Sequence, residues 1–560
     1  MALMLSQRFA LPAVVGRLLA GRGIGPADAP GFLDPRLRDL MPDPSHLLDV
    51  DVAAARLADA VGRHERVGII SDYDVDGATS AALVREWAET AGLEVRLRIP
   101  NRLTDGYGPS PALFDALADD GCTVVFVLDS GTTAFDALDH AQRRDLDVIV
   151  VDHHPAERAL PRACAVVNPN RADQVSPCTG LAAVGVTFLV LVAANRELRR
   201  RGAFGDGAEP ALMGSLDLVA LGTVADVVPL LGLNRAFVRQ GLKLLNAAPR
   251  PGIAALLEVT GVRLPLTAER IAFALAPRLN AAGRLADATL AADLLGARDL
   301  ERVTRLAQQL DALNADRRVV EAEVTATAQR QLQAQVEADR RVLLAAGKDW
   351  HPGVLGIVAG RMAERFHRPV LVAGVAAEEA VGSARAPDGF DLGAALRATV
   401  ASGLARRAGG HARAGGFTVD AAKLTAFHDA LEANAGTPST PTLRVDAAVA
   451  VGGADGALVA ATAALEPYGE RHPAPRWRIV GGRIAATRPV GDAHLGLTLA
   501  GDDGTRLDGI AFRARGQALG QALTAAAGGA PIQLAGRLQA SRYRGHGRAE
   551  VIVEDVAAGS

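Results

Sequence analysis

The sequence is poor in cysteine and has no long apolar run. Three of its 560 residues are cysteines, Cys122, Cys164 and Cys178, and none lies in a C-x-x-C pair or within a histidine cluster. This pattern argues against a disulfide framework and against a zinc site. No stretch reaches the roughly 18 apolar residues of a membrane span, and the N-terminus lacks a signal-peptide cleavage pattern. We therefore expect a cytoplasmic protein without a membrane partner.

Aromatic residues and excess charge are scarce as well. Aromatics make up 4% of the chain, and 60 basic against 63 acidic residues give a net charge of −3. The whole chain therefore has no electrostatic signature of nucleic-acid binding, and any such surface must be local. With 49% hydrophobic and 22% charged residues the composition is that of a globular protein. The length suggests three or four domains.

Acidic residues, by contrast, are concentrated in the stretch RVGIISDYDVDG, where Asp72, Asp74 and Asp76 alternate. The pattern begins like an EF-hand calcium loop, but that loop requires a bidentate Glu at its twelfth position, and the twelfth residue here is Leu83. The apolar run VGII before the acids also predicts a buried strand rather than a helix. The carboxylates are therefore expected at the carboxyl end of a strand, where α/β sheets place their active sites.

Other acidic residues follow further apolar segments. Asp129 follows VVFVL, Asp152 follows VIVV and begins a triplet with His153 and His154, and Asp226 lies in GTVADVVPL. We expect these segments to meet at one edge of one sheet, where unpaired charges in apolar surroundings are costly. Convergent carboxylates then either have raised pKa values or need cations. Oxygen ligands with one or two imidazoles and no thiolate suit Mg²⁺ or Mn²⁺, and two such ions can clamp both oxygens of a phosphoester displacement.

The chain is expected to be an α/β protein of several domains. An irregular lead-in over residues 1–50 precedes a domain at 51–297, in which short apolar strands alternate with helical patterns and predict a parallel sheet covered on both faces. A segment without Gly or Pro predicts one long helix over 298–340 that joins two domains across a cleft, with a coiled-coil dimer as the alternative. A smaller α/β domain is expected at 341–436. Alternating strands predict an OB-like β-barrel at 443–560.

The motifs of this sequence resemble known families. DYDVDG, the Asp-His-His triplet and GTVADVVPL are similar to the DHH phosphoesterase superfamily, and HPGVLGIVAGRMAERF, GSAR and GGHARAGG are similar to its companion DHHA1 domain. With IPNRLTDGYG and APRLNAAGR added, the chain resembles, in order and over its whole length, the RecJ family of bacterial single-stranded-DNA-specific 5′→3′ exonucleases. It departs in small ways: Arg471 and His472 stand where the family more often has Gly-Asn, and Leu128 and Ser130 flank Asp129 in place of more usual residues.

The resemblance implies a centre that binds two divalent cations, Mn²⁺ or Mg²⁺. Its ligands would be Asp74, Asp76, Asp129, His153 and Asp226, with Asp129 bridging the two ions. Asp72 and Asp152 would be either ligands or orienters of ligands. His154 would contact the scissile phosphate.

The resemblance also implies a pocket for the 5′-terminal phosphate of DNA. That phosphate would be held by Arg102, Ser383, Arg385, and one of Arg278 and Arg284, which flank Asn280. An arginine can hold a phosphate bidentately, although a solvated surface charge is the alternative for any one of them. His411 and Arg413 lie between the glycine pairs of GGHARAGG, where backbone amides can also cradle a phosphate.

The predicted barrel is locally basic. Residues 471–548 contain twelve arginines and four acids, a local charge of +8. Trp477 lies between Arg476 and Arg478, and Tyr543 lies between Arg542 and Arg544. Interleaved arginines and aromatics are typical of a groove for single-stranded nucleic acid, where charge follows the backbone and rings stack on bases. The alternative is that alternation along a strand buries Trp477.

The family resemblance thus implies a metal-dependent exonuclease that degrades single-stranded DNA 5′→3′ to 5′-mononucleotides in DNA repair and recombination. It further implies a monomer whose partners are a single-strand-binding protein and a RecQ-type helicase. One alternative is a related enzyme that cleaves short oligonucleotides, cyclic dinucleotides or pyrophosphate. A second is a DNA-binding scaffold without activity, but every acid of the metal motifs is present in this sequence.

Overall fold

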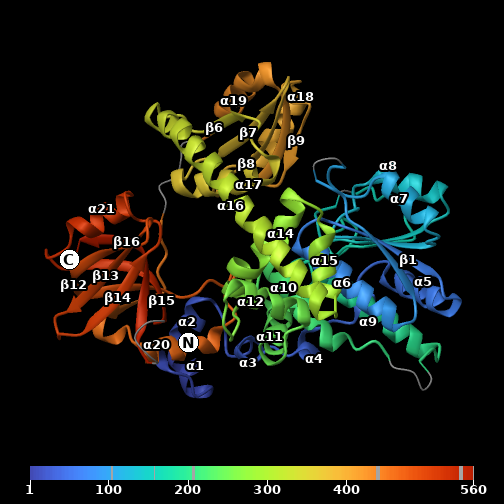
Figure 1. Cartoon of the computed structure of the whole chain (residues 1–560). Helices are drawn as coiled ribbons and strands as arrows, with labels where there is room; N and C mark the ends of the chain where they lie inside the picture. The colour runs from blue at the N-terminus through green and yellow to red at the C-terminus, as the bar shows by residue number, and fades with distance from the viewer. Residues whose placement is uncertain (103–104, 157, 205–208, 437–441, 542–546, 559–560) are drawn as a thin grey trace. The chain divides into compact units, whose positions relative to one another are not determined.

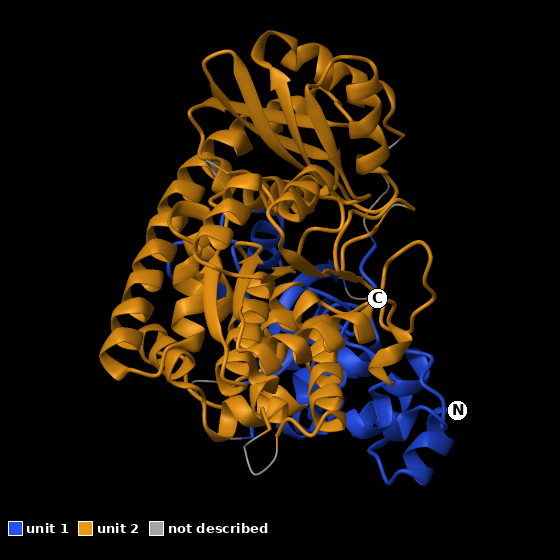
Figure 2. Cartoon of the chain, turned by 90° about the vertical axis from the view of Figure 1, so that its right-hand side faces the viewer, with its two compact units in different colours: residues 1–42, 227–239, 442–560 blue, residues 43–226, 240–441 orange. Residues whose placement is uncertain are grey.

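The computed structural model describes residues 1–102, 105–156, 158–204, 209–436, 442–541 and 547–558. The chain divides into two compact units (Figure 2). One unit consists of residues 43–226 and 240–441, and the other of residues 1–42, 227–239 and 442–560.

The first sheet of the larger unit is parallel throughout. Its central strands are short, apolar and almost completely buried, as expected of a sheet covered on both faces, whereas the edge strand Glu94–Arg98 is charged and only partly buried. The strand order is β2 (Glu94–Arg98), β1 (Arg66–Ser71), β3 (Val124–Leu128), β4 (Asp147–Val151) and β5 (Ala165–Val167). This order reverses direction between β1 and β3, so the loops that leave those two strands diverge and open a crevice, the usual ligand site of such sheets.

Helices cover both faces of this sheet (Figure 1). On one face lie α7 (Pro111–Asp119) and α8 (Phe135–Arg143), and on the other lie α5 (Val50–Arg63), α6 (Val75–Thr90) and α9 (Ala183–Arg200). The core under α7 and α8 is formed by Phe114, Leu117 and Leu138 with the buried strand residues. The predicted α/β class with a parallel sheet is confirmed.

A helical segment follows the sheet and carries several of the motifs. It contains α10 (Leu216–Ala225), α11 (Gly232–Ala247), α12 (Pro251–Thr260), α14 (Ala276–Leu285) and α15 (Thr289–Gly296). A π-helical turn, Ile271–Leu275, leads into α14.

The predicted long helix is confirmed as α16 (Leu300–Glu337), which has 38 residues. Its apolar stripe is occupied within the chain: Val324, Ala328 and Leu332 belong to one core with α17 (Pro352–Phe366) and with β6 (Leu343–Lys348). A coiled-coil dimer is therefore not needed to bury this stripe.

The second sheet of the larger unit is mixed. The order is β6, β7 (Val370–Ala376), β8 (Glu379–Arg385), β10 (Ala414–Asp420) and β9 (Arg407–Gly410), and only β6 and β7 are parallel. One face packs on α17, and the other packs on α18 (Leu392–Ala401) and α19 (Leu424–Ala433). The predicted smaller α/β domain is confirmed.

The smaller unit contains a closed β-barrel. Its strands run in the order β12 (Arg476–Val490), β13 (His494–Gly501), β14 (Arg506–Ala511), β16 (Ala549–Ala558) and β15 (Ile532–Ala540), and β15 pairs back with β12. The predicted OB-like barrel is confirmed.

The first 42 residues are not an irregular lead-in. They form α1 (Ala2–Arg8), α2 (Ala13–Gly21), α3 (Ala29–Leu33) and α4 (Leu37–Leu40). Leu5, Val15 and Leu19 share one apolar core with barrel residues such as Ile479 and Leu497. The N-terminal helices and the barrel therefore fold as one body, although more than 400 residues separate them in the sequence.

Within the described part of the chain, no helix combines the length and the apolar character that crossing a membrane requires.

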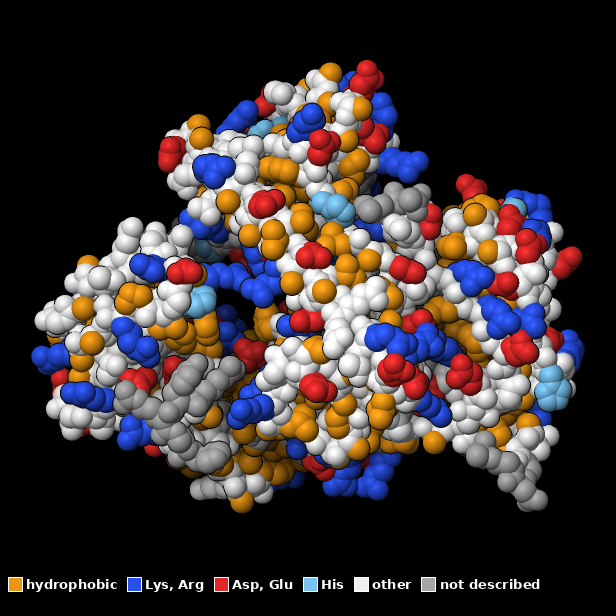
Figure 3. Space-filling view, in the orientation of Figure 1, with side chains coloured by type: hydrophobic (Ala, Val, Ile, Leu, Met, Phe, Trp, Pro, Cys, Tyr) orange, Lys and Arg blue, Asp and Glu red, His pale blue; other side chains and the backbone are white. Residues whose placement is uncertain are grey.

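On the surface drawn in Figure 3, Lys and Arg side chains are interspersed with Asp and Glu rather than gathered into one basic field, in keeping with the net charge of −3.

Candidate metal centre and phosphate pocket

The predicted ligands meet at the carboxyl edge of the parallel sheet, beside the switch point between β1 and β3. Asp72, Asp74 and Asp76 follow β1, Asp129 follows β3 with a left-handed backbone (φ 60°), and His153 follows β4. The sequence placed Asp226 only in an apolar segment expected to meet the same edge of the sheet. Asp226 caps the C-terminus of α10, so a helix brings this carboxylate to the sheet edge.

The ligand atoms form three overlapping groups. Each group lies within 4.8 Å: Asp72, Asp74 and Asp129; Asp76, His153 and Asp226; and Asp129, His153 and His154. Asp129 and His153 each belong to two of these groups, so the groups overlap at these two residues.

Three buried atoms of the centre have no hydrogen-bond partner among the described residues: Asp129 Oδ1, His153 Nε2 and Asp226 Oδ2. They converge, because His153 Nε2 lies 3.3 Å from Asp129 Oδ1 and 3.6 Å from Asp226 Oδ2. Leaving such atoms unpaired is costly, and a cation between them would satisfy all three.

The electrostatics of the centre agree with cation binding. Burial and then the charge of Asp74 raise the pKa of Asp72 well above its usual value, and the same two causes raise the pKa of Asp76 to about 7. Burial and then the neighbouring carboxylates raise the pKa values of Asp129 and Asp226. A bound divalent cation reverses this balance and favours the ionised carboxylates.

The surroundings of His153 favour its neutral form. Burial and the nearby His154 lower its pKa to about 4. Its Nδ1 lies 3.0 Å from the backbone oxygen of Leu181, so Nδ1–H donates there and Nε2 presents its lone pair to the centre. Metal-binding histidines usually have such an outer partner.

The loop after β1 is fixed by hydrogen bonds and by close packing. Asp74 caps α6 by accepting from the backbone N–H of Asp76 at 2.9 Å, and Asp76 accepts from Ala183 and Val184 at the start of α9, at 2.6 and 2.9 Å. Gly77 is required by space, because a Cβ there would lie 2.2 Å from the backbone oxygen of Asp72.

The sequence left the role of Asp152 open, and in the structure both of its carboxylate oxygens accept hydrogen bonds. Its Oδ2 accepts from the Thr132 hydroxyl at 2.7 Å, and its Oδ1 accepts from His154 Nδ1 at 2.8 Å and from two backbone N–H groups. Burial opposes ionisation, but these hydrogen bonds and the charge of His154 outweigh it and lower the pKa of Asp152 to about 2. Its oxygens are therefore already occupied.

Sequence reasoning missed two residues behind Asp152. Asn168, completely buried after β5, donates from Nδ2 to the Thr132 hydroxyl at 3.0 Å and to the backbone oxygen of His154 at 2.9 Å. Thr132 and Asn168 thereby fix the orientation of Asp152 and His154. The available signal was that both are polar residues just after strands of the same sheet.

The cations of the predicted phosphate pocket come from both α/β domains. The Arg102 guanidinium lies 4.1 Å from the Tyr73 ring centroid, and its buried Nε has no hydrogen-bond partner in the part of the chain that the structure describes. Arg284 donates to the backbone oxygen of Gly353 at 2.8 Å. Burial, and then the charge of Arg102, lower the pKa of Arg284 to about 10 and also lower the pKa of Arg385. A bound anion would relieve this repulsion.

Ser383 and Arg385 lie together against α17. A Cβ on Gly356 would lie 3.2 Å from Arg385 Nη2 and 3.4 Å from Ser383 Oγ. Arg278 instead pairs with Asp311 of α16 at 2.6 Å. Of the two arginines that the sequence could not choose between, Arg284 is thus the one whose electrostatics place it beside Arg102 and Arg385.

The remaining predicted phosphate ligands lie at the edges of this region. Asn280 accepts from the backbone N–H of Val75 at 3.1 Å, so it supports the metal-binding loop. His411 and Arg413 lie in the exposed turn between β9 and β10, and the Arg413 backbone accepts from Ala386, next to Arg385.

The prediction that Trp477 stacks on DNA bases is wrong. Burial alternates along β12, and Trp477 is 3% exposed in the barrel core beside Ile479, while Arg478 faces outward. Arg476 pairs with Glu554 at 2.5 Å. Arg542, Tyr543 and Arg544 lie outside the described residues.

The barrel nevertheless has an exposed aromatic side chain. Phe512, which is 52% exposed, packs edge-on against His494, with 5.2 Å between ring centroids. The backbone N–H of Arg513 donates to His494 Nδ1 at 2.8 Å, and Arg515 is likewise exposed. His472, one of the positions where the sequence departs from the family pattern, has a structural role, because its ring is buried and contacts Arg22.

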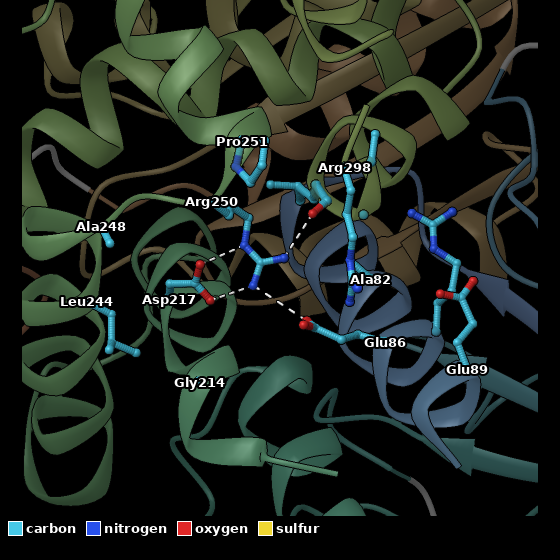
Figure 4. A pocket seen from close by; sticks show the side chains of 14 residues that line it. Ala82, Glu86, Glu89, Gly214, Asp217, Leu244, Ala248, Arg250, Pro251 and Arg298 are labelled. Atoms are coloured by element: carbon cyan, nitrogen blue, oxygen red, sulfur yellow. Dashed lines mark hydrogen bonds and ion pairs between the residues drawn. The ribbon is translucent and has the colours of Figure 1, made fainter. Parts of the chain in front are cut away.

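A cavity of about 240 Å³ lies away from this centre, between the far half of α6 and the start of α10 (Figure 4). Arg250 crosses it, with Nε and Nη2 at 2.6 and 2.7 Å from the two oxygens of Asp217 and with Glu86 at 3.6 Å. Because Arg250 pairs with both Asp217 and Glu86 across this cavity, we interpret these residues as a brace between the two ligand-bearing helices rather than as a substrate site.

Comparisons with known proteins agree with this geometry. The chain matches models of the DHH family N-terminal domain over residues 66–223, of the DHHA1 domain over 339–437 and of the RecJ OB domain over 445–555. It is 37% identical to the single-stranded-DNA-specific exonuclease RecJ of Dickeya dadantii, over 97% of this chain and 96% of that protein.

Solved structures are similar as well. The crystal structure of RecJ from Thermus thermophilus in complex with Mn²⁺ matches with a TM-score of 0.81 at 28% identity, over all of this chain and 78% of that one. A structure of the same protein in complex with Mg²⁺ matches with a TM-score of 0.76 at 28% identity, over all of this chain and 77% of that one.

Proposed function

Because the chain belongs to the RecJ family of single-stranded-DNA-specific exonucleases, we propose that its metal centre hydrolyses single-stranded DNA from the 5′ end, releasing 5′-mononucleotides. The observation that carries this proposal is the convergence of three unpaired buried ligand atoms on Asp129, His153 and Asp226, beside a cluster of arginines that suits a terminal phosphate.

The donor set fits two divalent cations, Mn²⁺ or Mg²⁺. Asp72, Asp74 and Asp129 would hold one ion, and Asp76, His153 and Asp226 would hold the other with Asp129 shared. When bound, such ions activate water and neutralise charge on the phosphate.

The chain's own residues orient the scissile phosphate. Although burial opposes it, the hydrogen bond and charge of Asp152 raise the pKa of His154, which favours a protonated ring. Because Nδ1 donates to Asp152, Nε2–H of His154 is free to donate to a phosphate oxygen. His154 would therefore hold the substrate, and Asp152 would hold His154.

The direction of degradation follows from a pocket for the 5′-phosphate. Arg102 and Arg284 would bind it from the first α/β domain, and Ser383 and Arg385 from the second. Charge-assisted contacts of this kind are strong and geometrically specific. Arg385→Ala should therefore reduce the preference for 5′-phosphorylated ends more than it reduces cleavage itself.

The barrel contributes a surface for the strand outside the metal centre. Phe512 offers a ring face for a base, and Arg513 and Arg515 offer charge for the backbone. This replaces the stacking role that the sequence suggested for Trp477. Arg478 remains a candidate contact, because its side chain is exposed.

Cellular context rests on the family alone. We propose a cytoplasmic monomer that acts in repair and recombination with a single-strand-binding protein and a RecQ-type helicase. Light scattering of the purified protein tests the monomer, and co-purification from cells tests the two partners.

The proposed function is tested by a nuclease assay on long single strands, blunt duplexes and a dinucleotide. We expect Mn²⁺- or Mg²⁺-dependent cleavage of the single strand, none in EDTA, and none by Asp129→Ala. Asp316→Ala, which removes an exposed acid of α16, is the matched control. Cleavage of the dinucleotide alone would favour the short-oligonucleotide enzymes, and binding without cleavage would favour the scaffold.

A further inference from the structure

The apolar stripe of α16 is interrupted by three buried polar side chains. Asn314, Arg317 and Glu321 are 4%, 8% and 1% exposed. Glu321 and Arg317 are ionisable, and such residues are almost never fully buried unless they are paired. The sequence pattern shows this region only as a gap in the helix's apolar repeat.

These side chains connect α16 to α17. Arg317 donates to Glu321 Oε2 at 2.6 Å and to Asn314 Oδ1 at 3.0 Å. The other oxygen of Glu321, Oε1, pairs with Arg361 of α17. One buried carboxylate thus binds a guanidinium from each helix, and we call these four residues the interlock.

Helix α17 lies between the two halves of the proposed phosphate pocket. Near its start, the backbone oxygen of Gly353 accepts from Arg284. Three residues later, Gly356 contacts Ser383 and Arg385 of β8. Any shift of α17 along or around α16 would therefore move Ser383 and Arg385 relative to Arg284.

We infer that the interlock is a positioning device that fixes the register of α17 on α16 and thereby sets the geometry of the pocket for a 5′-terminal phosphate. Buried ion pairs add little net stability compared with apolar packing, but they can specify one arrangement among several. The interlock selects the arrangement in which both halves of the pocket face the same phosphate. This inference rests on the proposed pocket.

The test compares two arginines of α17. Arg361→Met removes one arm of the interlock. Arg365→Met is the matched control, because Arg365 lies one turn later, is exposed, and donates to the half-buried Gln329 of α16 at 3.3 Å. The measured quantity is the ratio of kcat/KM for a 5′-phosphorylated strand to that for the same strand with a 5′-hydroxyl end.

We expect Arg361→Met to lower this ratio by on the order of 10- to 100-fold, since misplacement by about 1 Å can have an effect of that size. Arg365→Met should leave the ratio unchanged, and Arg361→Lys should recover part of it. Cleavage of the 5′-hydroxyl strand by Arg361→Met should persist, which shows that the variant folds. An unchanged ratio in Arg361→Met would overturn the inference.

A second measurement separates this inference from the pocket assignment. Amide hydrogen exchange at residues 353–358 of the DNA-free protein should be faster in Arg361→Met than in Arg365→Met, because the start of α17 loses its anchor. If the unmodified protein shows no 5′-phosphate preference, the proposed pocket fails, and the exchange comparison still decides whether the interlock holds α17. Equal exchange in both variants would refute the interlock itself.

Discussion

Replacing Asp226 by Asn should stabilise the metal-free protein while abolishing its activity. Asp226 Oδ2 is buried and accepts no hydrogen bond, so the substitution removes a charge without removing a partner. Ligand atoms of Asp226 and Asp76 lie within 4.8 Å of one another. Two negative charges at that separation repel by about 3 kcal/mol at an effective dielectric constant near 20, and this repulsion is what the variant relieves.

The effect should depend on pH with a defined sign. In the folded, metal-free protein the pKa of Asp226 is raised above its ordinary value of 3.8, and the pKa of Asp76 is raised to about 7. The unfolded chain therefore loses these protons first, so wild-type stability falls as pH rises from 3.8 through the raised values. Because Asn cannot titrate, the variant's advantage should be smaller at pH 5 than near pH 8.

The assay is thermal unfolding in EDTA at both pH values, repeated with Mn²⁺ in excess. A change of 1 kcal/mol moves the midpoint by about 2–4 °C in a domain of 150–250 residues and by less in larger ones. A Mn²⁺ concentration of 100 times its Kd adds about 2.7 kcal/mol to the free energy of unfolding of the wild type. The variant should lack this gain. Asp316→Asn is the control for removal of an exposed acid. If Asp226→Asn were less stable than wild type in EDTA at pH 8, the charge-repulsion account of this centre would be wrong.

Two further variants test the positioning of His154 and the barrel surface. Thr132→Val removes the hydroxyl that binds Asp152 and should lower kcat about 10–100-fold, the size typical of outer partners in metal sites. The Mn²⁺ affinity of Thr132→Val, measured by calorimetry, should stay the same, and Thr132→Ser, which keeps the hydroxyl, should recover kcat. Equal kcat in Thr132→Val and Thr132→Ser would argue against the positioning of His154 through this hydroxyl. Phe512→Ala should weaken binding of a long single strand by about 1–3 kcal/mol in fluorescence anisotropy, whereas Phe512→Tyr should not; unchanged binding by the Ala variant would place the groove elsewhere.

The sequence was informative about the site wherever an acid follows a strand directly. Asp129 and His153 were placed correctly because parallel strands end at one edge of a sheet, and a short apolar run fixes where each strand ends. Asp226 was found by its motif, but the element that supports it was not, since a short apolar run is compatible with either a strand or a buried helix.

Trp477 was misassigned for a related reason. Composition showed a basic segment with an interleaved aromatic, but the side chains of a strand alternate between faces, so an aromatic between two arginines points the opposite way from both. Phe512 follows the end of β14, where alternation no longer dictates burial. Thr132 and Asn168 were missed because single polar residues carry no pattern until the sheet brings them beside Asp152.

Contacts between distant segments explain why the barrel cannot be deleted cleanly to test its role. Arg235, 1% exposed, donates to the backbone oxygens of Leu465, Glu466 and Pro467 and to that of Phe32. Deleting residues 443–560 would remove three of these acceptors, and hydrogen bonds to a charged group contribute roughly 1.5–3 kcal/mol each. Residues 227–239, which carry Arg235, directly follow Asp226 in the chain, so the truncation would disturb a metal ligand as well as a DNA-binding surface. Loss of activity in such a truncation would therefore not reveal which function was lost, whereas Phe512→Ala changes one exposed side chain and leaves the Arg235 contacts intact.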